Sequence, residues 1–122
     1  MKKITAIVFV LFFVFAAASW AHPPENIIIT FDGATSILKA DIIHHSKDIT
    51  QHFIDEAWVF VNGEMAVDQK FKTQTDAAHQ VVKYILPGIK PGDKIEVGAE
   101  CSVFGKDKKG ITISNLQPKR KK

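Results

Sequence analysis

Residues 53–71 read FIDEAWVFVNGEMAVDQKF, and this stretch decides the fold that the sequence predicts. Hydrophobic residues dominate positions 53–61, and Asn62-Gly63 follows them directly. This dipeptide accepts the positive φ angles that a type I′ turn requires, so it indicates a tight hairpin. The returning strand is expected over residues 65–71. The stretch therefore predicts two antiparallel strands, the first unit of a β fold.

Short hydrophobic segments separated by turn signals lie on both sides of this hairpin. Asp32-Gly33, Pro87-Gly88 and Pro91-Gly92 are typical turn dipeptides, because Pro fixes φ and Gly adopts conformations that other residues resist. The expected strands are residues 26–31, 36–44, 53–61, 65–71, 80–86, 94–103 and 110–116. About seven short strands predict an all-β, immunoglobulin-like antiparallel β-sandwich. We expect these aromatic residues to fill its core: Phe31, Phe53, Trp58, Phe60, Phe71, Tyr84 and Phe104.

Length and composition fit one globular domain. The 122 residues are 46% hydrophobic and 24% charged, and a chain of this size has room for a single core. Lys and Arg number 16 against 13 Asp and Glu, but the basic excess comes from Lys2, Lys3 and the basic tail at residues 117–122. Because the body between them lacks a basic surface interleaved with aromatic residues, a nucleic-acid-binding function is not expected.

The first 21 residues have the pattern of a secretory signal peptide. Lys2 and Lys3 precede an apolar run over residues 4–18, and Ser19-Trp20-Ala21 has the small-x-small pattern of a cleavage site. The apolar run is shorter than the roughly 20 residues that cross a bilayer, and no second run follows. We therefore expect cleavage after Ala21 and a secreted protein without a membrane span in the mature chain. The bacterial periplasm is the expected compartment.

Histidines and one cysteine offer the clearest chemistry in the sequence. His44 and His52 flank the polar loop over residues 45–51, and in a sandwich the two ends of such a loop are close in space. Cys101 is the only cysteine, so it cannot form a disulfide within the chain. Neutral imidazole and thiolate are ligands of borderline transition metals, which predicts a metal site. His45 is an alternative to His44, because adjacent strand residues face opposite sides.

The order of these residues resembles that of the superoxide reductases, whose iron domain is shared by desulfoferrodoxin and neelaredoxin. The matching strings are His44 followed eight positions later by His52-Phe-Ile-Asp-Glu and an Asn-Gly hairpin, and later Glu100-Cys101-x-x-Phe104-Gly105. The resemblance implies a desulfoferrodoxin-like domain over residues 22–116 that binds non-haem iron. Its implied metal ligands are His22, His44, His52 and Cys101.

In that family, four equatorial imidazoles and one axial cysteinate hold the iron, and superoxide is reduced to hydrogen peroxide at an open sixth position. The resemblance implies the same oxidoreductase role here, with Cys101 as the catalytic thiolate. It implies superoxide or another small redox substrate and an electron-donor protein as partners. Two features depart from the family. Phe104 stands where the fourth imidazole belongs, and the family's Glu-Lys pair before the first histidine is missing, which leaves Lys47 as a candidate replacement.

Two other functions stay open at the level of sequence. If Ala21 is the last residue removed, the α-amine and imidazole of His22 can chelate copper(II), which favours nitrogen ligands in tetragonal geometry. This alternative is a periplasmic copper carrier without turnover, and zinc is a further alternative metal. The second is a metal-free sandwich that binds a partner, with Cys101 as a small buried apolar residue and His79 on the surface. The sequence does not set the oligomeric state.

Overall fold

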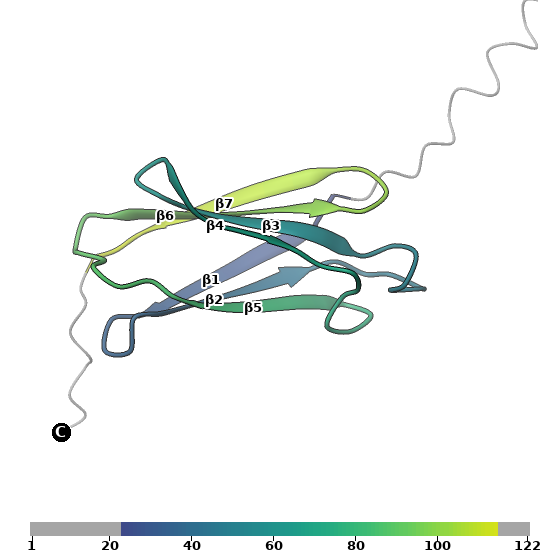
Figure 1. Cartoon of the computed structure of the whole chain (residues 1–122), viewed down its shortest axis with the longest axis horizontal. Helices are drawn as coiled ribbons and strands as arrows, with labels where there is room; N and C mark the ends of the chain where they lie inside the picture. Colours follow the sequence, from purple (N-terminus) through teal and green to yellow (C-terminus); the bar gives the residue numbers. More distant parts are fainter. Residues whose placement is uncertain (1–22, 115–122) are drawn as a thin grey trace, which may run out of the picture.

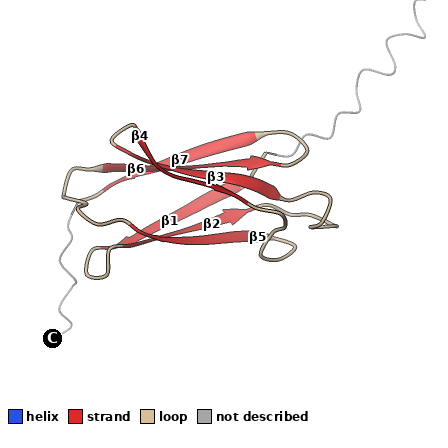
Figure 2. Ribbon diagram, viewed as in Figure 1, coloured by secondary structure: helices blue, strands red, loops and turns tan. Residues whose placement is uncertain are grey.

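The computed structural model describes residues 23–114, which form two packed layers of β-strands (Figure 1). All regular elements within these residues are strands (Figure 2). They are β1 (Asn26–Asp32), β2 (Ile37–Ile43), β3 (Ile54–Val61), β4 (Glu64–Lys70), β5 (His79–Ile85), β6 (Lys94–Cys101) and β7 (Lys106–Thr112). No helix in this part of the chain is long and apolar enough to span a membrane. The predicted signal peptide, His22 and the basic tail lie outside the described residues.

The strands form two antiparallel sheets, as the all-β prediction requires. One sheet has the order β1-β2-β5 and the other β4-β3-β6-β7. A constant-type immunoglobulin domain pairs its fourth strand with its fifth, whereas β4 pairs with β3 in this protein. The antiparallel sandwich is therefore confirmed for residues 23–114, and a closer immunoglobulin-like relationship stays a prediction.

The Asn62-Gly63 turn joins β3 and β4 as the sequence predicts. Asn62 has φ 52° and Gly63 has φ 84°, the positive values that favour this pair of residues. The Asn62 side-chain amide also forms two hydrogen bonds to the segment that begins β6. Its Oδ1 accepts from the Lys94 backbone N–H at 2.9 Å, and its Nδ2 donates to the Asp93 carboxylate at 3.0 Å. The turn therefore closes the hairpin and also fixes the start of β6.

The core between the two sheets is aliphatic, so the expectation of an aromatic core is wrong. Its buried members are Ile27, Leu38, Ala40, Ile42, Ile54, Ala57, Val59, Val82, Leu86, Ile95, Val97, Ala99 and Ile113. Side chains alternate along a strand, so the inward positions Ala57 and Val59 leave Trp58 and Phe60 on the outer face of the four-stranded sheet. Phe104 is exposed. Three of the expected aromatic residues pack against the margin of the core: Phe31, Phe71 and Tyr84.

The last strand begins earlier than the sequence predicts. The prediction placed it over residues 110–116, but β7 runs from Lys106 to Thr112. Its first four residues are charged, which concealed the strand from a search for hydrophobic alternation. β7 is an edge strand, and lysines on an edge strand oppose unwanted pairing with another chain. The polar composition of this segment is therefore compatible with its place at the edge of the sheet.

Two matched isoleucine substitutions test the placement of the core. Ile95 is fully buried between the sheets, whereas Ile85 is 73% exposed. Ile95→Ala is expected to lower the free energy of unfolding by about 2–5 kcal/mol, because it removes buried methyl groups and leaves a cavity. Ile85→Ala is expected to change it by no more than about 0.5 kcal/mol. Urea denaturation followed by circular dichroism measures both, and equal losses in the two variants would contradict this core.

Candidate metal centre

Three of the four predicted metal ligands meet at one end of the sandwich. His44 directly follows β2, His52 lies just before β3, and Cys101 is the last residue of β6. Each contributes one ligand atom, and these atoms all lie within 4.8 Å of one another. Among residues 23–114, no other group of three or more His, Cys, Asp or Glu side chains is placed in this way. The fourth predicted ligand, His22, lies outside the described residues.

The topology explains why these three residues meet. β2 and β3 belong to different sheets, so the connection between them crosses from one layer to the other and carries a histidine at each end. The His44 and His52 rings are nearly perpendicular, with centroids 4.7 Å apart. Cys101 pairs with Ile54 in the β3–β6 ladder. The thiol therefore lies beside the start of β3, where His52 enters the strand.

The centre is buried on one side and borders the surface on the other. His44 is fully buried and Cys101 is 3% exposed, whereas His52 is half-buried. His52 also lines a surface depression of about 650 Å³, together with Lys47 and Asp48 among other residues. Hydrogen bonds from Thr50 lower the pKa of Asp48, which keeps this carboxyl anionic at neutral pH. A small molecule from solvent would therefore approach the centre from the His52 side.

Sequence analysis missed Gln74, which is the main polar neighbour of His44. The Gln74 side chain is 3% exposed, and its Oε1 lies 2.9 Å from His44 Nδ1. The same oxygen accepts a hydrogen bond from the Ile54 N–H at 3.1 Å. Gln74 Nε2 donates to the backbone carbonyls of His44 at 2.6 Å and Asp76 at 2.9 Å. A single glutamine in a polar segment has no sequence pattern that would have singled it out.

The donor set fits a transition metal of the borderline class. The other ring nitrogen of His44, Nε2, is buried and has no hydrogen-bond partner among the described residues. Metal–nitrogen bonds of about 2.0–2.1 Å and metal–sulfur bonds of about 2.3 Å place two donors of one tetrahedral metal about 3.3–3.6 Å apart. The three ligand atoms lie within 4.8 Å of one another, so metal binding would draw them closer by up to about 1 Å. Two imidazoles and one thiolate suit iron, copper or zinc, and the group does not identify which.

The structure separates His44 from the neighbouring histidine that the sequence left as an alternative. His45 is exposed, and its Nδ1 lies 2.7 Å from a Glu25 carboxylate oxygen. It does not belong to the group that His44 forms with His52 and Cys101. Phe104, which was expected to replace a fourth imidazole on the basis of the resemblance alone, is 68% exposed in the turn after β6. The described residues therefore supply two imidazoles rather than four.

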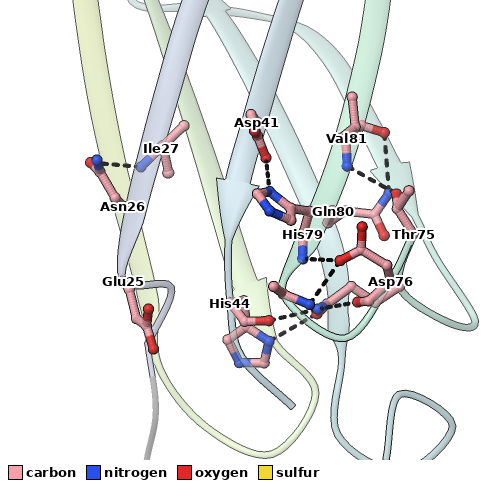
Figure 3. Close-up of polar contacts among 12 residues, drawn as sticks. Glu25, Asn26, Ile27, Asp41, His44, Thr75, Asp76, His79, Gln80 and Val81 are labelled. Carbon is pink, nitrogen blue, oxygen red and sulfur yellow. Dashed lines mark hydrogen bonds and ion pairs between the residues drawn. The ribbon is translucent and has the colours of Figure 1, made fainter.

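His79 does not belong to the group of His44, His52 and Cys101, and it has a carboxylate partner of its own, Asp41 (Figure 3). Its Nδ1 is 2.7 Å from Asp41 Oδ1, and the pair joins β5 to β2. The hydrogen bond to the Asp41 carboxylate raises the pKa of His79 above its ordinary value. The expectation of a simple surface residue is therefore incomplete, because His79 is half-buried and paired.

This pair gives a pH-dependent contribution to stability with a defined sign. Because the folded-state pKa of His79 is raised, the contribution is complete below the unfolded-state pKa and is lost as pH rises through the folded-state pKa. Asp41→Asn is expected to lower the pKa of His79 in an NMR titration. The difference in unfolding free energy between the wild type and this variant is expected to shrink from about pH 5 to about pH 8. A difference that grew over this range would contradict the ion pair.

Comparisons with family models, with curated proteins and with solved structures found no match for this chain.

Proposed function

We propose that the protein is an exported iron-binding protein of the superoxide reductase type, with iron held by His44, His52 and Cys101. The observation that supports this most is the convergence of two imidazole nitrogens and one thiolate sulfur within 4.8 Å, two of the three side chains being buried. A site with this donor set selects a transition metal over calcium or magnesium, which prefer oxygen ligands. The choice of iron rests on the resemblance between the order of these ligands and that in the superoxide reductases.

His22 is the proposed fourth donor. Pro23 lies against the turn after Cys101, because a Cβ placed on Gly105 would approach the Pro23 nitrogen to 2.8 Å. Gly105 also accepts a hydrogen bond from the Cys101 N–H at 2.8 Å. Pro23 therefore lies at the end of the sandwich where the three ligands meet, and His22 precedes it in the sequence. A third imidazole from His22 would complete a site of three nitrogens and one sulfur.

Bound iron would supply a one-electron couple and an open coordination position for a small oxidant such as superoxide. The Cys101 thiolate would donate electron density to the metal, and His44 and His52 would hold it in place. Lys47 lines the depression beside His52, but Glu25 and Asp48 line it as well. The two carboxyl groups counteract the positive charge of Lys47, so we expect little electrostatic steering of superoxide toward the centre.

Removal of single ligands tests the iron centre. Cys101→Ser and His52→Ala are each expected to abolish retention of iron in mature protein loaded with iron(II) without oxygen. His45→Ala is the matched control and is expected to retain it, because His45 is exposed and paired with Glu25. Elemental analysis gives the iron content, and a thiolate-to-iron charge-transfer band is expected after oxidation. A colourless wild-type protein without bound iron would contradict the proposal.

Copper is the second candidate, because sets of two histidines and one cysteine also bind copper. In a copper carrier that uses the amino terminus, the α-amine of His22 is itself a ligand. Retaining Ala21 in front of His22 would then weaken copper(II) binding strongly, because the α-amine moves away from the imidazole. An imidazole-only site would bind equally well in both forms. Isothermal titration of the two proteins with copper(II) distinguishes the two arrangements.

A further inference from the structure

We infer, on the basis of the metal-binding function proposed above, that Gln74 is a positioning residue that prepares His44 to bind metal through Nε2. The Gln74 side chain is buried and bonds to four groups around the centre, at 2.6–3.1 Å.

The hydrogen bonds fix the orientation of the Gln74 amide. A backbone N–H can only donate, so the atom 3.1 Å from the Ile54 nitrogen is the amide oxygen. Backbone carbonyls can only accept, so the atom that faces the carbonyls of His44 and Asp76 is the amide nitrogen. Three independent backbone groups therefore agree on one orientation, and rotating the amide by 180° would oppose all three.

This orientation determines the tautomer of His44. Because the Gln74 oxygen faces Nδ1 at 2.9 Å, the neutral His44 ring carries its hydrogen on Nδ1 and donates it to Gln74. The lone pair then remains on Nε2, which is buried and has no hydrogen-bond partner among residues 23–114. A buried acceptor without a partner is unfavourable in a metal-free protein. A metal bound at Nε2 would satisfy it.

Gln74 also holds the ligand-bearing segments at a fixed separation. His44 follows β2 in one sheet, and Ile54 begins β3 in the other. One amide side chain bonds to the backbone of both, so it connects the layers where the ligands meet. Ile54 also pairs with Cys101. Neighbours of this kind that orient a metal-ligating histidine contribute about 10–100-fold in metal affinity.

Two substitutions of Gln74 and one control test this role in the mature protein. Gln74→Leu removes the acceptor for Nδ1–H, whereas Gln74→Glu keeps an acceptor oxygen at that place and replaces the amide donor by a carboxyl oxygen. Gln80→Leu is the matched control, since Gln80 is another buried glutamine but its amide bonds to Val81 rather than to His44. Circular dichroism establishes that each variant is folded.

The first readout is nitrogen-15 NMR of the imidazole rings in metal-free protein, which identifies the protonated nitrogen of His44. We expect Nδ1–H in the wild type, in Gln74→Glu and in Gln80→Leu, and a mixture of tautomers in Gln74→Leu. The second readout is anaerobic iron(II) affinity. It is expected to fall about 10–100-fold in Gln74→Leu and to stay close to wild type in Gln80→Leu.

An Nε2-protonated His44 in the metal-free wild type would overturn the inference, and this result needs no variant to fold. Unchanged tautomer and affinity in folded Gln74→Leu would overturn it too. Absence of iron binding by wild-type protein whose His44 carries its hydrogen on Nδ1 would instead overturn the proposed iron function. The NMR readout therefore separates a failure of the positioning role from a failure of the metal site.

Discussion

Aliphatic packing between the two sheets is the constraint on which the candidate centre depends. Paired sheets pack about 10 Å apart, and side chains such as Ile42, Ile54 and Ile95 fill the space between them. His44 follows a strand of one sheet, whereas His52 precedes a strand of the other and Cys101 ends one. Their ligand atoms meet only while the core holds the layers together. A metal bound to all three would in turn join the layers and stabilise the folded state.

The end of the sandwich where the three ligands meet differs from this apolar core, because it contains buried polar groups. Burial of a polar group is tolerated when its hydrogen bonds are made within the protein, and Gln74 satisfies three backbone groups and His44 Nδ1. The Nε2 atom of His44 is different, because it is buried without such a partner among the described residues. The hydrogen bonds of Gln74 are thus complete, whereas one ring nitrogen of His44 is left for a ligand.

The sequence predicts the parts of this protein that depend on local patterns. Asn62-Gly63 sets a hairpin through its own backbone preferences, and the histidines at both ends of one loop mark the site. The start of β7 was not predicted, because a charged edge strand does not need hydrophobic alternation. The prediction of an aromatic core was wrong, because Trp58 faces outward and its neighbours Ala57 and Val59 fill the interior. Gln74 became visible only in three dimensions, since its role depends on contacts from two sheets.

The number of nitrogen donors bears directly on the choice between metals. Phe104 carries no donor and is exposed, so the turn after Cys101 adds no imidazole to those of His44 and His52. For a given set of nitrogen and sulfur ligands, affinity rises from iron(II) to copper(II), so the donors alone do not select iron. Selection of iron must therefore come from ligand geometry or from the metals supplied in the compartment. A fixed His44 Nε2 contributes to geometry, because it restricts the direction from which one of the few nitrogens can bind.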